Sequence, residues 1–453
     1  MKFRFSFMLL LAILTIGLGG TAFAFHDGGV ADCAGCHSMH NTPNANSTKG
    51  GGPYLLSGSD QSSTCLNCHG SSSQSSYHSM TYPFAGGNGF SGNVTTVPVN
   101  YSPGGDFAWL LVTTTYSSHG NVISQGQARG HSIIAVDYGL GVDTQTGHAV
   151  APGGTFPSGA LYCNSCHDPH NKMRRDSTGA IANFSTNRTS VLPIIGSGSY
   201  PSSVTGTVGV QAPGANQAVG VYRILAGYST YMAAGIPIPY PGVPMAIAPS
   251  TYNQKEDTPA HTVRVAYGTG TGTNQANWGD WCGACHKTFV SGPGAHYHPV
   301  DSNAVLTQGN EYSNYNAYVS SGNMTGSPGT SYLSLVPFVT ASSKVADLAV
   351  LADSTGTVTA GPGQSDQASC LSCHRAHASG WPHALRWNAG SEFITYVTSN
   401  GATTWPGTDT TPSNLGFADG MTSTQVQAAY YGRPATVFGP FQRGLCNKCH
   451  AQD

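Results

Sequence analysis

The chain has 453 residues, and only 8% of them are charged, against about 25% in typical soluble proteins. A formal net charge of −2 gives no basic surface of the kind that binds nucleic acid. Gly is abundant, with 59 copies, but an apolar content of 39% argues against disorder. Few segments show helical periodicity, so something other than packed helices must supply the core.

The first 24 residues are expected to form a secretory signal peptide. Lys2 and Arg4 supply its charged start, residues 5–18 its apolar stretch, and residues 22–24 an Ala-x-Ala cleavage site. The apolar stretch is shorter than the roughly 20 residues that a membrane span needs. We therefore expect a mature chain of residues 25–453 that is exported and has no membrane span.

The pattern Cys-x-x-Cys-His follows, and it occurs six times. It is the attachment motif of c-type haem, in which both thiols form thioethers and the His ligates the iron. The copies are Cys33, Cys36 and His37; Cys65, Cys68 and His69; Cys163, Cys166 and His167; Cys282, Cys285 and His286; Cys370, Cys373 and His374; and Cys446, Cys449 and His450. One copy would also be typical of half a zinc site. Six copies that use all 12 cysteines predict six covalent haems and leave no thiol for other chemistry.

Copies one, three and five continue with a second histidine three residues later, at His40, His170 and His377. The sixth ligand of a haem approaches from the face opposite the proximal His, and so short a segment cannot pass round the ring. These residues must therefore ligate a neighbouring haem, unless they are surface or propionate-facing side chains. If each serves the preceding odd-numbered haem, His170 serves haem one and His377 serves haem three. His40 is then left for haem five of an adjoining protomer.

Six haems with two axial histidines each need six distal ligands. Beyond the three above, the sequence offers His26, His78, His131 and His298, which makes seven candidates for six positions. The other histidines are expected at the surface or near propionates: His119, His148, His261, His296 and His383. Methionine is the rival ligand, but only Met39 and Met173 lie near a motif, and they share no pattern. We expect low-spin, low-potential, bis-His haems.

Several arginines lie near motifs or candidate ligands and are candidates to pair with haem propionates, the alternative being solvated surface residues. They are Arg129, Arg174, Arg175, Arg375, Arg386 and Arg443.

Seven segments resemble the OmcS-type extracellular hexahaem cytochromes, a family that forms filaments called cytochrome nanowires in metal-reducing bacteria. The segments are residues 25–40, 102–107, 163–170, 221–225, 370–377, 429–433 and 445–451. The resemblance extends in order over essentially the whole mature chain. It implies a loop-rich fold, stacked bis-His haems, and a filament contact in which His40 ligates a haem of the next protomer. Insertions around residues 310–331 and 399–413 depart from the family and bear on the surface.

The expected fold is a single domain over residues 25–453, mostly coil, with short helices at the binding motifs and a few hairpins. Hairpins are expected near residues 108–115 and 204–210, and residues 236–241 are expected to be extended but not a central strand. This coil would wrap a linear row of six haems, with haems one and six at opposite ends.

Three functions are compatible with six haems. The first is a polymerising electron conduit, the second a monomeric extracellular terminal reductase of metal oxides or humics, and the third a nitrite or hydroxylamine reductase. The third needs an open iron and often an altered motif, whereas all six motifs here are regular and histidines suffice to close every iron. We therefore expect electron transfer rather than catalysis, by a head-to-tail homopolymer at the outer cell surface or beyond. Its partners would be redox donors and extracellular acceptors.

Overall fold

The computed structural model describes residues 33–38, 53–70, 78–82, 84, 97–117, 121–170, 172–183, 192, 194–205, 212–228, 231–249, 263–290, 299–307, 309–352, 355, 357–410 and 415–450. The predicted signal peptide, residues 1–24, lies outside these ranges.

The helices are short, and most of the six haem motifs lie on one. The α-helices are α2 (Cys33–Cys36), α3 (Gln61–His69), α4 (Ser202–Thr205), α5 (Trp278–Cys282), α6 (Lys287–Val290), α7 (Glu311–Ala317), α8 (Val345–Leu351), α9 (Cys370–Cys373), α10 (Leu415–Ala418), α11 (Ser423–Ala429) and α12 (Asn447–His450). The 3-10 turns are η1 (Pro53–Leu55), η2 (Phe107–Leu111), η3 (Gly126–Arg129), η4 (Val136–Tyr138), η5 (Ser158–Ala160), η6 (Cys163–Ser165), η8 (Tyr222–Ile224), η9 (Pro382–Ala384) and η10 (Ala435–Val437). Helices of one or two turns have little stability of their own, so tertiary contacts must hold the motifs.

The strands form small separate sheets. They are β1 (Thr114–Ser117), β2 (Asn121–Ser124), β3 (Met173–Asp176), β4 (Ile181–Asn183), β5 (Ala218–Gly220), β6 (Tyr231–Ala233), β7 (Ile236–Ile238), β8 (Val243–Ile247), β9 (Ala266–Gly268), β10 (Gln275–Ala276), β11 (Val339–Thr340), β12 (Tyr396–Val397) and β13 (Thr403–Thr404). The largest sheet in the described part of the chain has the order β10-β8-β9-β11. β8 and β9 are antiparallel, while β10 and β11 each run parallel to their neighbour.

The core brings distant parts of the chain together. One apolar cluster joins residues from the first third, such as Leu66 and Trp109, to residues from the last third, such as Trp381 and Tyr430. A second cluster contains Trp278 and Trp281 and lies in the middle of the chain. Motif cysteines pack at the edges of both clusters. The core is therefore arranged around the haem attachment points.

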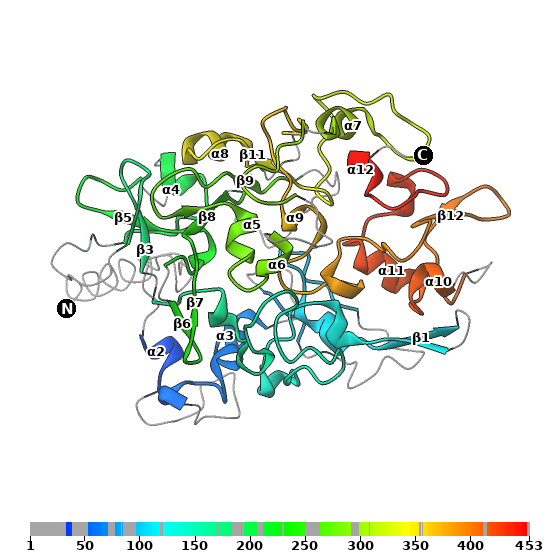
Figure 1. The fold of residues 1–453 in the computed structure, drawn as a ribbon. Coiled ribbons are helices and arrows are strands. Elements are labelled where there is room, and N and C mark those ends of the chain that lie inside the picture. The colour runs from blue at the N-terminus through cyan, green and yellow to red at the C-terminus, as the bar shows by residue number, and fades with distance from the viewer. Residues whose placement is uncertain are drawn as a thin grey trace, which may run out of the picture.

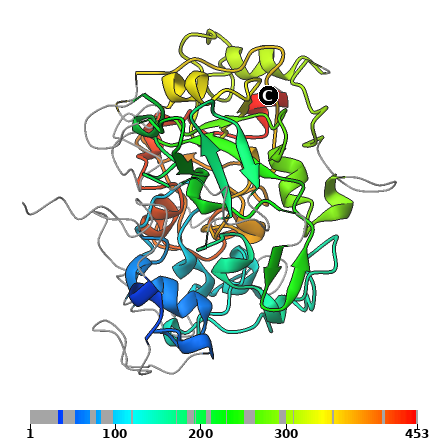
Figure 2. The same cartoon turned by 90° about the vertical axis from the view of Figure 1, so that its left-hand side faces the viewer.

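The first and last motifs lie far apart. In Figure 1, α2 lies at the lower left of the molecule and α12 at the upper right. After a turn of 90°, the blue segment of α2 is still near the bottom and the red segment of α12 near the top (Figure 2). This agrees with the expected placement of motifs one and six at opposite ends.

One detail of the predicted fold is wrong, and a second is tested only in part. Residues 108–111 are not in a hairpin but in η2, because the buried Asp106 carboxylate accepts a hydrogen bond from the Ala108 N–H and starts a 3-10 turn. The hairpin begins later, at β1 and β2. Residues 204 and 205 belong to α4, and the rest of that predicted hairpin lies outside the described residues. The extended run at residues 236–241 is confirmed in part, since β7 pairs only with β6.

Candidate haem-binding sites

The proximal histidines of motifs one, three and five are held in the same way. Each directs its Nδ1 at a backbone carbonyl: His37 at Tyr54 (2.9 Å), His167 at Arg223 (2.8 Å) and His374 at His383 (2.7 Å). Because a carbonyl only accepts, Nδ1 must carry the proton. Nε2 is then left with its lone pair, which is the atom that an iron would bind.

Each of these carbonyls belongs to an unusual turn. Two consecutive residues other than Gly have positive φ: Tyr54 and Leu55 (61° and 58°), Arg223 and Ile224 (50° and 49°), and His383 and Ala384 (59° and 55°). This left-handed conformation costs about 1–2 kcal/mol per residue. Its recurrence beside three proximal histidines indicates a functional constraint.

A pair of backbone hydrogen bonds fixes each turn to its motif. The residue after the proximal histidine donates to the second left-handed residue, in the pairs Ser38 to Leu55 (2.7 Å), Asp168 to Ile224 (2.8 Å) and Arg375 to Ala384 (2.7 Å). The chain beyond the turn donates back to the second motif cysteine, in the pairs Ser57 to Cys36 (2.9 Å), Ala226 to Cys166 (2.9 Å) and Arg386 to Cys373 (2.8 Å). We call these three units modules one, three and five.

The sequence alone gives little sign of these turns. Residues 53–56, 222–225 and 382–385 share only their final leucine, at Leu56, Leu225 and Leu385. That signal is too weak to stand out, because the left-handed pair is imposed by contact with a histidine up to 56 residues away.

Two pairs of predicted ligands face one another. The ring centres of His167 and His377 are 6.2 Å apart, and those of His131 and His286 are 5.9 Å apart. Two imidazoles on opposite sides of one metal, each with a metal–nitrogen bond of about 2 Å, have ring centres roughly 6 Å apart. Both pairs therefore fit the two axial positions of a haem iron.

The surroundings of His377 are built for a close approach. Its ring stacks on Phe107 with centres 4.6 Å apart, and a Cβ on Gly104 would lie 2.7 Å from its Nδ1. The His131 N–H donates to the His377 carbonyl (2.8 Å), so the two distal candidates occupy adjoining backbone segments. Gly104 and Phe107 belong to one of the segments on which the family resemblance rests.

Burial favours the neutral form of the two distal candidates, His131 and His377. It lowers the pKa of His131 to about 4 and that of His377 to about 3. The Nδ1 atoms of His131 and His286 also lie against backbone carbonyls, those of Ala376 (2.7 Å) and Pro152 (2.8 Å). A neutral imidazole that is protonated on Nδ1 is the form that ligates a metal through Nε2.

The remaining predicted ligands are less fully described. His170 is exposed and lines a cavity of about 250 Å³ with Asp168 and Tyr231. His78 is half-buried, and the next residue, Ser79, donates its N–H to the carbonyl of His69 (2.9 Å). His26, His40 and His298 lie outside the described residues. His148 and His383 are exposed, as expected.

The motif cysteines form two contacts between consecutive motifs. The thiols of Cys65 and Cys163 are in hydrogen-bonding contact, which joins motifs two and three. The thiols of Cys282 and Cys370 make the equivalent contact between motifs four and five. In both pairs the contact is made by the first cysteine of each motif.

All six arginines that the sequence suggests as propionate partners donate to oxygen atoms of the protein, and Arg129 and Arg443 illustrate two kinds of contact. The buried Arg129 donates to the carbonyls of Val112 and Gly380 and to the hydroxyls of Thr114 and Ser124.

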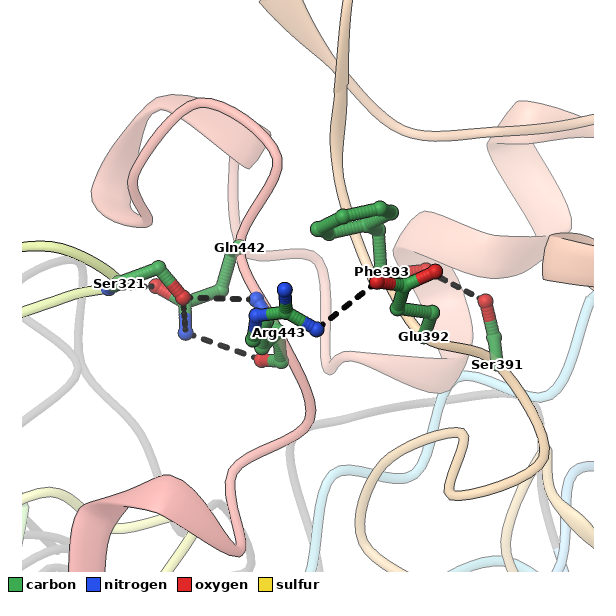
Figure 3. Close-up of polar contacts among 6 residues, drawn as sticks. All are labelled: Ser321, Ser391, Glu392, Phe393, Gln442 and Arg443. Carbon is green, nitrogen blue, oxygen red and sulfur yellow. Dashed lines mark hydrogen bonds and ion pairs between the residues drawn. The ribbon is translucent and has the colours of Figure 1, made fainter. Parts of the chain in front are cut away.

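Arg443 pairs with Glu392 at 2.9 Å and lies over the Phe393 ring (Figure 3). Both charges of this pair are well exposed. Arg129 and Arg443 therefore tie together segments that are distant in the chain, and their pairing with haem propionates stays a prediction.

Comparisons with known proteins agree with this arrangement. No protein-family model matches the chain. The C-type cytochrome OmcS of Geobacter sulfurreducens is 42% identical over 446 residues, which is 95% of each chain. Among solved structures, the cryo-EM structure of the OmcS nanowires from Geobacter sulfurreducens matches with a TM-score of 0.80 at 39% identity. A structure of the outer membrane cytochrome S filament from the same organism matches with a TM-score of 0.79 at 39% identity. Each covers 94% of this chain and 100% of the solved one. By sequence and by structure, the chain belongs to the OmcS family of c-type cytochromes.

Proposed function

We propose that this protein is an extracellular electron conduit that carries six bis-His haem c groups in a row and polymerises head to tail. The observation that carries the proposal is the facing of His167 with His377 and of His131 with His286, at the separation of two axial ligands. Histidines on both faces would leave no open coordination position on an iron held between them, which favours electron transfer over bond-making catalysis. None of the described helices has the length and apolarity to cross a bilayer.

The ligand assignment follows from the modules. His377, from motif five, serves haem three, whose proximal ligand is His167. Because modules one, three and five are built alike, His170 from motif three is assigned to haem one by the same step back along the chain. His40 from motif one has no preceding haem in its own chain, so it is assigned to haem five of the adjoining protomer.

The even-numbered haems take ligands from elsewhere in the chain. His131 is assigned to haem four with His286. Haems two and six then share three candidates, His26, His78 and His298, of which two are required.

The cysteine contacts favour the same polymer. The first cysteines of motifs two and three meet, as do those of motifs four and five, so a repeat of the same contact would pair motif six with motif one of the next protomer. Motifs one and six lie at opposite ends of the molecule (Figures 1 and 2). A head-to-tail contact would bring them together, and such heterologous contacts propagate as open filaments when the rotation does not close a ring. The related OmcS protein forms nanowires.

Bound haem supplies the one-electron redox chemistry. The residues of the chain fix the attachment points through twelve cysteines and fix the tautomer of each proximal histidine that we described. Buried aromatic side chains such as Trp381 and Trp109 exclude water from the surroundings of the motifs. Residues 25–453 form one hexahaem domain in this proposal.

The test is His40→Ala in protein that is loaded with six haems. One iron in six should become high-spin or water-ligated, and filaments should be lost in electron micrographs. His148→Ala, at an exposed histidine to which no haem is assigned, is the matched control and should keep both. Normal filaments with six low-spin haems in the His40 variant would overturn the bridging assignment, and a wild-type protein that stays monomeric would favour the terminal reductase.

A further inference from the structure

Modules one, three and five share their backbone but not their charge. The residue after the proximal histidine is Ser38, Asp168 and Arg375, respectively, and in all three its N–H donates to the second left-handed residue. Asp168 is 4% exposed and Arg375 is 1% exposed. Equivalent positions beside three haems therefore hold a neutral group, a buried carboxylate and a buried guanidinium.

A second difference lies on the other side of the motif. In module three, the Tyr231 hydroxyl donates to the carbonyls of Asn164 (2.5 Å) and His167 (3.0 Å). These carbonyls belong to the residue after the first cysteine and to the proximal histidine. A neutral phenol therefore caps this motif.

In module five, a cation replaces the phenol. Arg386 donates from Nε to the same two carbonyls, those of Leu371 (2.7 Å) and His374 (3.2 Å). Its Nη1 donates to the carbonyl of Ser334 (3.3 Å), and the side chain is 1% exposed. These acceptors are neutral, and a guanidinium stays protonated in proteins.

Both modules have further charges nearby, among them Lys172, whose N–H donates to Asp168 in module three, and Asp280, which lies near Cys370 in module five. Module three also contains Arg223, which is half-buried, donates to the Tyr200 hydroxyl (3.0 Å) and lies near both His167 and His377. Module five has a further buried cation nearby, Arg433, which like Arg375 lies against the Tyr431 ring. Module one has Ser38, Tyr54 and Ser57 at the corresponding positions. Module five thus holds two buried cations, Arg375 and Arg386, at the places where module three holds Asp168 and Tyr231.

A fixed cation beside an iron stabilises the reduced state, because reduction lowers the positive charge of the iron. We propose that Arg386, supported by Arg375, is a potential-setting residue that raises the reduction potential of haem five. One electron passes from a neighbouring reduced haem to haem five, so that the donor iron is oxidised by one unit and haem five is reduced by one. The inference rests on the proposed function in one respect: the first titration below assumes that His40 ligates haem five, so that its loss makes haem five high-spin.

The experiment uses His40→Ala protein, in which haem five is the one high-spin haem and its absorption is followed separately during a potentiometric titration. Adding Arg386→Gln should lower the ratio of reduced to oxidised haem five at a fixed potential by roughly tenfold, which is about 59 mV for one electron. In protein that retains His40, Arg386→Gln should move one of six one-electron components by the same amount. The second titration decides the inference even if His40 proves not to be the bridging ligand.

Two further variants separate charge from hydrogen bonding. Tyr231→Phe removes the equivalent hydrogen bonds in module three without a change of charge. It should leave the reduction potential of haem five unchanged. Arg386→Lys retains the cation, so the potential of haem five should match that of the protein with Arg386. This variant tests the inference if the Gln variant loads fewer than six haems. The inference would be overturned by an unchanged potential of haem five in Arg386→Gln. It would also be overturned if Arg386→Lys shifted this potential as much as the Gln variant does.

Discussion

At the scale of single residues, the three pairs with positive φ are backbone conformations that lower stability but orient a proximal histidine. His383 has a φ of 59° and an exposed side chain, yet its carbonyl orients His374. The backbone conformation at this position matters and the side chain does not. The stability of variants at position 383 should therefore depend on how well the new residue tolerates a positive φ.

We predict that His383→Val is less stable to unfolding than His383→Gly by about 1–2 kcal/mol, because a β-branched residue is strained at positive φ. Chemical denaturation followed by circular dichroism measures the difference. The same two substitutions at His148, which is exposed and has no positive φ, form the control and should not favour Gly. Equal stability of the two His383 variants would show that the turn relaxes.

A second prediction concerns His377. His377→Ala should leave haem three without its distal ligand and convert one iron in six to a high-spin state, while the covalent haem content stays at six. Absorption spectra and intact mass report the two quantities. Six low-spin haems in the variant would exclude His377 as a ligand, and His148→Ala again serves as the control.

Most of the candidate haem-binding residues could be predicted from the sequence. The cysteines and proximal histidines lie within five-residue motifs, and His170 and His377 stand at fixed distances from them. The left-handed pairs and the caps by Tyr231 and Arg386 could not be read, because they depend on contacts between segments far apart in the chain.

At the scale of elements, short helices depend on their caps. In α3, the Asp60 carboxylate accepts hydrogen bonds from the N–H and hydroxyl of Ser63 and from the N–H of Val136. It therefore caps the helix that carries motif two and ties it to η4. The prediction of short helices is confirmed. The predicted hairpin at residues 108–115 is wrong because the Asp106 side chain caps a 3-10 turn there, η2, and the sequence pattern alone does not reveal this cap.

We predict that Asp60→Ala lowers the free energy of unfolding by roughly 2 kcal/mol, the upper range for loss of a helix N-cap. Asp143→Ala provides a control, since Asp143 accepts from the nearby N–H groups of Gln145 and Thr146 but caps no helix. The control should change stability by less than about 0.5 kcal/mol. Equal losses in both variants would mean that the cap of α3 contributes nothing specific.

At the scale of the whole molecule, contacts between cysteines join consecutive haem motifs in pairs. Motifs two and three and motifs four and five are joined through their first cysteines, and motifs one and six lie at opposite ends. The histidine pattern of the sequence predicts a bridge between protomers at His40, which stays a prediction because His40 lies outside the described residues. The contacts between cysteines could not be foreseen, because they are set by how the intervening loops fold back.

The most direct test of this account is a cryo-EM structure of the secreted, haem-loaded protein. We predict a filament in which His40 of each protomer ligates haem five of the next and in which Cys446 of motif six lies beside Cys33 of the following motif one. Isolated protomers in which haem five has both axial ligands from its own chain would contradict it.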